Sequence, residues 1–243
     1  MGIEERLVDR PGVSTPGEDA AWRSLSERLV ISLRPVGAPT SIGFFGLAAA
    51  SLPFSGLQLG WVRPDEGRQV ALVMIGFAFL AQALAAVVGL LARDGTAATA
   101  MATLALTWLV VGWVTNTSPP GTTSRALGLF LIFSGSAMAL NAATASLSKL
   151  VPATVFAVAA LRFFSTAGYH LSGAAGWQRA AGVIGLILFV LAMYAAWAAG
   201  LEDALGRTVL PLGRRGKGRV AVTGSLLEQT GEVVTEPGVR QQL

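Results

Sequence analysis

The chain has 243 residues, of which 53% are hydrophobic and 13% are charged, with a formal net charge of +4. A soluble domain typically carries about 25% charged residues, so the shortage of charge favours a membrane protein. The absence of cysteine excludes disulfide bonds and thiolate metal sites.

Residues 1–39 are expected to form a cytoplasmic N-terminal tail. The first 20 residues include five acidic side chains and no apolar core, which is not the pattern of a signal peptide. Trp22 and Leu29 lie at helical spacing, whereas Leu29, Ile31 and Leu33 alternate as in a strand. A helix on the membrane surface and a small β-motif both fit this pattern, and we favour the strands.

Six segments downstream are long and apolar enough to cross a bilayer. The hydrocarbon core is about 30 Å thick and a helix rises about 1.5 Å per residue, so one span needs about 20 apolar residues. The six segments are residues 40–61, 69–92, 96–115, 124–143, 151–171 and 177–200. Polar turns separate them, or helix-breaking residues such as Pro119 and Pro120.

These segments are predicted to be helices. Lipid satisfies no backbone amide, so a spanning segment is either a helix or a strand of a closed barrel. Residues 81–91 and 183–193 lack the alternation of apolar and polar residues that barrel strands show. We therefore predict an all-α membrane protein, with a six-transmembrane-helix bundle over residues 40–205.

Lys and Arg near the span ends predict the orientation. Most of them fall on the side that holds both termini, so both termini are expected in the cytoplasm of a protein of the plasma (inner) membrane. The basic cluster of residues 214–219 could also indicate nucleic-acid binding. Beside a hydrophobic helix, we interpret it as a topology signal that contacts anionic lipid, and we expect no nucleic acid as a partner. Residues 206–243 form the second expected tail, in which Val220 and Val222 alternate as in a strand.

Polar residues within the spans are few and include no Asp or Glu, which argues against a carboxylate proton relay. Thr99, Thr103 and Thr107 recur every four residues and share one helix face. They could line a substrate path, or their hydroxyls could join helices or bond to their own carbonyls. Gln82 and Asn141 are further candidates for hydrogen bonds along a path.

Arg162 lies well inside the fifth span. It could attract an anion in a water-filled path, or its side chain could extend to the outer interface. The single histidine and the absence of intramembrane carboxylates leave no nucleophile with a base. We therefore expect no enzyme activity, no metal and no cofactor.

The segment that follows the last span, Gly206-Arg207-Thr208-Val209-Leu210-Pro211-Leu212-Gly213, resembles the closing motif of the acetate/succinate permease family. Tyr194 stands upstream at the spacing that this family uses. Weaker matches fall in the right order at residues 81–82, 89–91, 95–96, 99, 108 and 175–177. The resemblance covers residues 36–213, and residues 236–240 look like the tail of actinobacterial members.

The resemblance implies a homohexamer of six-helix bundles, with a path for small monocarboxylates such as acetate through each protomer. The three side chains that narrow the path in the family correspond to Phe45, Leu104 and Ala153. Leu104 and Ala153 replace a tyrosine and a leucine, so the pore constriction would be more apolar and wider. Of the family's entrance motif Asn-Pro-Ala-Pro, only Ala38 and Pro39 are kept.

Two classes of function follow. The first is a channel or carrier for small carboxylates, with the lipid bilayer and the substrate as partners. The alternative is a non-transporting scaffold or sensor that acts through its cytoplasmic tails, which the changed entrance motif supports.

Overall fold

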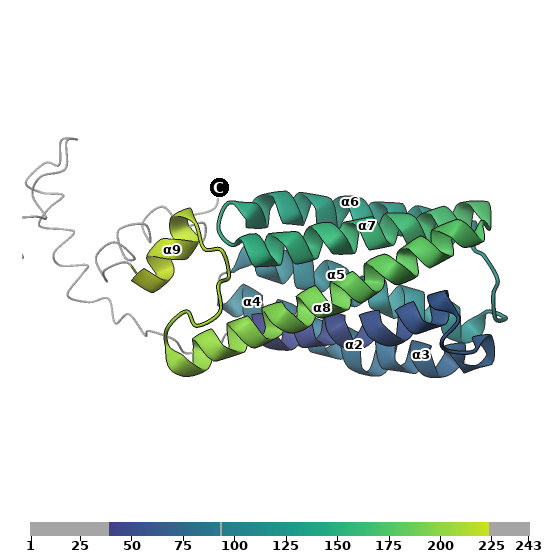
Figure 1. The fold of residues 1–243 in the computed structure, drawn as a ribbon, viewed down its shortest axis with the longest axis horizontal. Coiled ribbons are helices and arrows are strands. Elements are labelled where there is room, and N and C mark those ends of the chain that lie inside the picture. Colours follow the sequence, from purple (N-terminus) through teal and green to yellow (C-terminus); the bar gives the residue numbers. More distant parts are fainter. Residues whose placement is uncertain (1–38, 93, 224–243) are drawn as a thin grey trace, which may run out of the picture. The chain divides into compact units, whose positions relative to one another are not determined.

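The computed structural model describes residues 39–92 and 94–223. In it, six helices run lengthwise beside one another (Figure 1). The spans are α2 (Thr40–Leu59), Pro64–Leu91, α5 (Gly95–Thr117), α6 (Arg125–Ser146), α7 (Leu150–Ser172) and α8 (Ala175–Leu205). Each is long and apolar enough to cross a membrane, which confirms the predicted fold class.

The second span is a composite helix. It consists of the 3₁₀ turn η2 (Pro64–Glu66), α3 (Gly67–Val73), the π-helical η3 (Met74–Phe79) and α4 (Leu80–Leu91). The widened η3 lies against Gly112 of α5, where a Cβ atom would stand 2.8 Å from Ile75 Cγ1. A glycine is therefore required for this close approach of the two helices.

Side-chain caps and turn residues define several helix ends. Asp94 accepts a hydrogen bond from Ala97 N at 3.0 Å at the start of α5, and Ser124 accepts one from Leu127 N at 3.3 Å at the start of α6. These bonds satisfy backbone donors that the first helical turn leaves free. At the other end, α7 stops at Gly173, whose φ of 71° favours glycine.

The helices pack through small residues. α2 packs on α8, and α7 packs between α6 and α8. A Cβ at Gly135 of α6 would meet the ring of Phe164 at 2.8 Å, and one at Gly182 of α8 would meet Leu59 at 2.6 Å. Apolar side chains gain little from leaving lipid for one another, so close van der Waals contact of this kind is what favours helix association in a bilayer.

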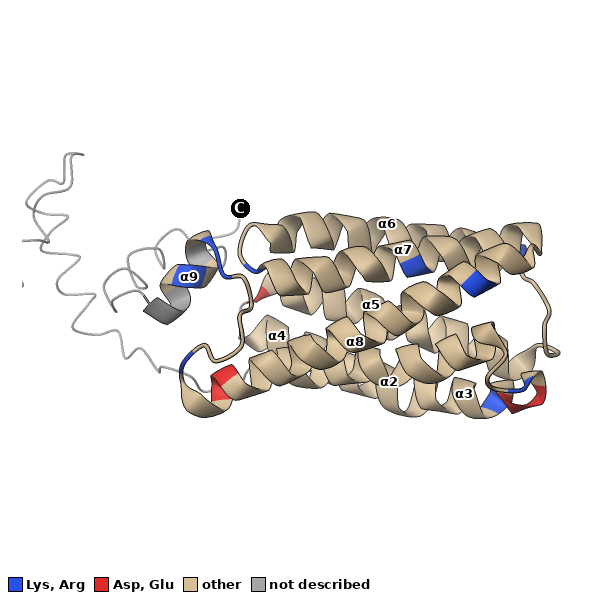
Figure 2. Ribbon diagram, viewed as in Figure 1, with Lys and Arg blue, Asp and Glu red and all other residues tan. Residues whose placement is uncertain are grey.

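Charged residues lie mainly near the two ends of the bundle, and most of its length is uncharged (Figure 2). Large apolar side chains such as Leu84, Leu90, Phe133 and Val190 are exposed on the outside of the bundle. An apolar exterior between charged ends is the surface that a bilayer accommodates.

The prediction of strands in the C-terminal tail is wrong where the structure describes that tail. Val220 lies in the short helix α9 (Gly216–Thr223), as does Val222. Between residues 39 and 223, the extended pairing that the structure shows outside helices is a single bridge between Lys149 and Arg214. The other alternating residues, Leu29, Ile31 and Leu33, lie outside the described residues, as does Arg93.

Candidate functional site

One buried polar group lies against the inner face of α2, near the start of that helix. Gln82 of α4 is fully buried and its Nε2 donates a hydrogen bond to the carbonyl of Gly43 at 3.4 Å. Its Oε1 has no partner among the described residues. Gly46 gives the amide its space, since a Cβ there would stand 3.1 Å from Gln82 Cγ. Gln82, predicted to line the path, thus lies in the core.

The residues predicted to narrow the path do not all face the same way. Leu104 and Ala153 are buried, with exposed fractions of 0% and 7%. Phe45 is 40% exposed and lines an apolar pocket of about 600 Å³ on the outer side of α2, together with Phe77 of η3. Its neighbour Phe44 is the buried aromatic.

Phe44 packs inside the bundle. Its ring lies 6.0 Å from the ring of Phe156 of α7, measured between centroids. Phe44, Leu104, Ala153 and Phe156 all belong to one buried cluster. That Phe45, Leu104 and Ala153 form one constriction stays a prediction, and Phe44 is the aromatic side chain that this face of α2 turns inward.

Arg162 lies in the interior and does not extend to the surface. It is 0% exposed, and its Nη1 donates to the carbonyl of Ser51 of α2 at 3.3 Å. Its Cζ lies 5.3 Å from the ring centroid of Phe54 and 5.4 Å from that of Trp108. These are cation–π distances, which partly offset the loss of water around the charge.

Unpartnered polar atoms occur on Arg162 itself and on two of the residues that contact it. Nε and Nη2 of the guanidinium, the hydroxyl of Ser51 and the indole Nε1 of Trp108 are buried without a hydrogen-bond partner in the described part of the chain. Buried polar atoms are ordinarily paired, so a concentration of unpaired ones marks a candidate binding site. Ser51 was not among the residues predicted from the sequence, and Trp108 was predicted only as part of a motif match.

A third polar group follows toward the other end of α2. Gln58 Nε2 donates to Thr166 Oγ1 at 3.4 Å, and Thr166 Oγ1 donates to the carbonyl of Arg162 at 2.9 Å. Gln58 Oε1 has no partner within the described ranges. Neither residue had been predicted, although Phe44, Ser51 and Gln58 recur every seven residues, which is the signal of a common helix face.

The threonines that share one face of α5, Thr99, Thr103 and Thr107, form a threonine stripe whose hydroxyl groups bond chiefly to their own helix. Thr103 Oγ1 donates to the carbonyl of Thr99 at 2.9 Å, and Thr107 Oγ1 donates to that of Thr103 at 2.7 Å. Thr107 is buried and also reaches Ser134 Oγ of α6 at 3.0 Å. Asn141 likewise donates to a carbonyl of its own helix, that of Ala137. These contacts match the second interpretation of the threonines, in which their hydroxyls join helices or bond to carbonyls of their own helix and do not line a path.

The segment predicted to be the family motif docks on the start of α7. The carbonyls of Leu212 and Gly213 accept hydrogen bonds from Val151 N and Leu150 N at 3.1 and 3.0 Å. They satisfy backbone donors that the first turn of α7 leaves free. Pro211 offers its carbonyl to Tyr194 Oη at 2.9 Å.

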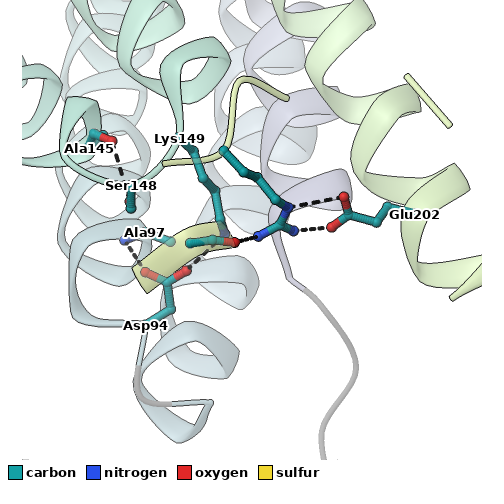
Figure 3. Close-up of polar contacts among 8 residues, drawn as sticks. Asp94, Ala97, Ala145, Ser148, Lys149 and Glu202 are labelled. Atoms are coloured by element: carbon teal, nitrogen blue, oxygen red, sulfur yellow. Dashed lines mark hydrogen bonds and ion pairs between the residues drawn. The ribbon is translucent and has the colours of Figure 1, made fainter. Parts of the chain in front are cut away.

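Glu202, near the end of α8, fixes the same segment from the other side. It accepts hydrogen bonds from Thr208 Oγ1 at 2.8 Å and from Arg214. Nearby, Lys149 pairs with Asp94 at 3.7 Å (Figure 3). Gly206 ends α8 with a φ of 63°, and Arg207 is exposed. The motif therefore acts in the fold, as a clasp between α7 and α8.

At the entrance motif, the structure describes Pro39, which precedes the first turn of α2, whereas Ala38 lies outside the described residues. No group of three His, Asp or Glu side chains able to hold a metal ion occurs within residues 39–92 and 94–223.

The apolar helices define a multi-pass membrane protein with a six-helix bundle. The fold is similar to that of the bacterial acetate channel SatP, with a TM-score of 0.66 and 23% sequence identity over 73% of this chain and 99% of SatP. No sequence family and no curated protein sequence matches the chain.

Proposed function

We propose that this protein is a membrane channel or carrier that passes small monocarboxylates such as acetate through the interior of its bundle. The likeness in fold to an acetate channel supports this class of function. The expected assembly is a homohexamer in the plasma membrane. The end of the bundle that carries Lys149, Arg214 and Arg215 would face the cytoplasm, because it holds more basic residues than the other end.

One observation carries the proposal. Buried polar groups with unpartnered atoms occur at three levels along α2, near Gly43, Ser51 and Gln58. At about 1.5 Å per residue, these levels are about 12 Å and 10 Å apart. An apolar core gains nothing from isolated polar atoms, whereas a path needs a polar contact at each stage of a crossing.

The side chains between the first two levels would narrow the path. Phe44 and Phe156 pack against each other there, and Leu104 belongs to the same buried cluster. We assign the aromatic role to Phe44, because Phe45 lines a pocket on the outer side of α2. Thr107 and Asn141 would contribute less than Gln82. The Thr107 hydroxyl bonds to its own helix and to Ser134, and the Asn141 amide nitrogen bonds to its own helix.

Uptake of labelled acetate by proteoliposomes that contain the full-length protein tests the proposal. Carboxylic acids have pKa values near 4 and their neutral form crosses lipid unaided, so uptake is measured at about pH 8 against protein-free vesicles. We expect saturable uptake that unlabelled formate or propionate reduces. If no short carboxylate enters faster than into empty vesicles, the proposal is wrong.

A further inference from the structure

The middle of the bundle holds a positive charge that no described side chain neutralises. Arg162 forms no ion pair within residues 39–92 and 94–223, and its exposed fraction is 0%. The carboxylates at one end of the bundle have other partners, since Asp94 pairs with Lys149 and Glu202 with Arg214. A buried, unpaired guanidinium costs several kcal/mol, and an anion beside it would offset that cost.

The free edge of the guanidinium has the geometry for a carboxylate. Nη1 is turned to the Ser51 carbonyl, whereas Nε and Nη2 have no partner in the described part of the protein. Nε and Nη2 lie on the same edge of the planar group and direct two N–H bonds in parallel. This fork matches the two oxygens of one carboxylate.

The neighbouring free groups are also donors. The indole N–H of Trp108 can only donate, and the Ser51 hydroxyl can donate as well as accept. Both are buried without partners among the described residues. A cation would meet three N–H groups and a positive charge here, so the ligand class is an anion. The rings of Phe54 and Trp108, which flank the guanidinium, favour an anion with a small apolar part.

α8 is adapted to this guanidinium. A Cβ at Gly185 would stand 2.6 Å from Arg162 Cζ and 2.1 Å from the hydroxyl of Ser55, so only glycine leaves the space that the arginine occupies. Four helices thus contribute to the position of one charged group: α2, α5, α7 and α8.

We propose that Arg162, Ser51 and Trp108 form a binding site for one small carboxylate anion inside the bundle. The choice of a carboxylate as the ligand rests on the proposed function, whereas the site itself rests on the free donors. The charge attracts the anion, the fork of Arg162 orients it, and the indole and hydroxyl groups complete its hydrogen bonds.

Equilibrium binding of labelled acetate to the full-length protein in detergent tests the site. We expect saturable binding that Arg162→Met weakens by at least about tenfold, since a hydrogen bond to a charged group contributes about 1.5–3 kcal/mol. Arg162→Lys keeps the charge without the fork and is expected to weaken binding less than Arg162→Met does. Arg179→Met, at an exposed position of α8, is the matched control and should bind as the wild type does.

Two milder variants keep the test valid if Arg162→Met does not fold. Trp108→Phe keeps an aromatic ring but removes the indole N–H group, and Ser51→Ala removes the hydroxyl. Each is expected to weaken acetate binding about threefold to tenfold. Unchanged affinity in both variants, or in a folded Arg162→Met, overturns the site. Chloride that competes at the same concentration as acetate overturns the choice of a carboxylate.

Binding and flux separate the two proposals. Acetate binding that depends on Arg162, without uptake into vesicles, supports the site and contradicts the transport function. The opposite result is that acetate uptake has the same rate in the wild type and in Arg162→Met, Trp108→Phe and Ser51→Ala, and that none of these variants weakens acetate binding. That result contradicts the site and leaves the transport function intact.

Discussion

Glu202 and Arg214 join the end of α8 to the segment that covers the start of α7. Arg214 Nε donates to Glu202 Oε2 at 3.1 Å, and a second bond links Nη2 to Oε1 (Figure 3). The side chains are only 15% and 13% exposed, so water screens this pair much less than a surface pair. The guanidinium also donates to the carbonyl of Gly218, which ties the start of α9 to the same point.

Glu202→Gln is expected to destabilise the protein by about 1–3 kcal/mol, because it leaves a largely buried guanidinium without its counter-charge. Thermal unfolding in detergent measures the change. Asp65→Asn is the matched control, since its pair with Arg63 has side chains that are 68–72% exposed and should cost less than about 1 kcal/mol. Equal losses in the two variants would contradict a structural role for the clasp.

Gly213 and Gly206 provide a second test of the clasp. Both have a positive φ, 66° and 63°, so alanine costs about 1 kcal/mol at either position. At Gly213 the new Cβ would also stand 2.7 Å from Leu150 Cβ, whereas nothing lies within 4 Å at Gly206. We expect Gly213→Ala to lower the melting temperature clearly more than Gly206→Ala. A loss that is the same in both, or larger at Gly206, would show that the segment does not press on α7.

Within the threonine stripe, we expect Thr107 but not Thr103 to stabilise the packing of α5 against α6, and by a small free energy. Thr107 joins α5 to α6 through Ser134, whereas the partner that the described part of the chain gives to the Thr103 hydroxyl is a carbonyl of its own helix. Interhelical hydrogen bonds in membrane proteins average about 0.6 kcal/mol. A double-mutant cycle of Thr107→Val with Ser134→Ala should give a coupling near that value, and Thr103→Val with Ser134→Ala should give none. Coupling in the second cycle would contradict the assignment.

The fold could be predicted from the sequence because a bilayer imposes one requirement on every span. A run of about 20 apolar residues must be helical in lipid, so hydropathy alone locates the six helices. The widened η3 segment could not be predicted, since Met74–Phe79 is as apolar as its surroundings and its close approach to Gly112 of α5 is a contact between distant parts of the chain. The short alternation at Val220 indicated a strand, but two residues are too few to separate a strand from a helix.

The candidate site could be predicted only in part. The depth of Arg162 in its span follows from counting residues, but its direction depends on Ser51, Trp108 and Gly185, which come from three other helices. Adjacent aromatic residues pose the same difficulty. Phe44 and Phe45 differ by about 100° around α2, and a resemblance between sequences does not decide which of them faces the interior.

Phe44 and Phe45 therefore provide the sharpest test of the path. Phe44 is 1% exposed and packs on Phe156, whereas Phe45 is 40% exposed on the outer side. We expect Phe44→Ala to raise acetate flux into proteoliposomes several-fold, because it removes the ring that narrows the interior, while Phe45→Ala leaves the flux close to that of the wild type. Phe44→Ala also creates a cavity that costs about 3–5 kcal/mol, so Phe44→Leu serves as a milder variant whose folding is checked by thermal unfolding. The reverse pattern, with faster flux in Phe45→Ala alone, would place the narrowing at Phe45 and move the path to the side of α2 that faces Phe77 and Met193.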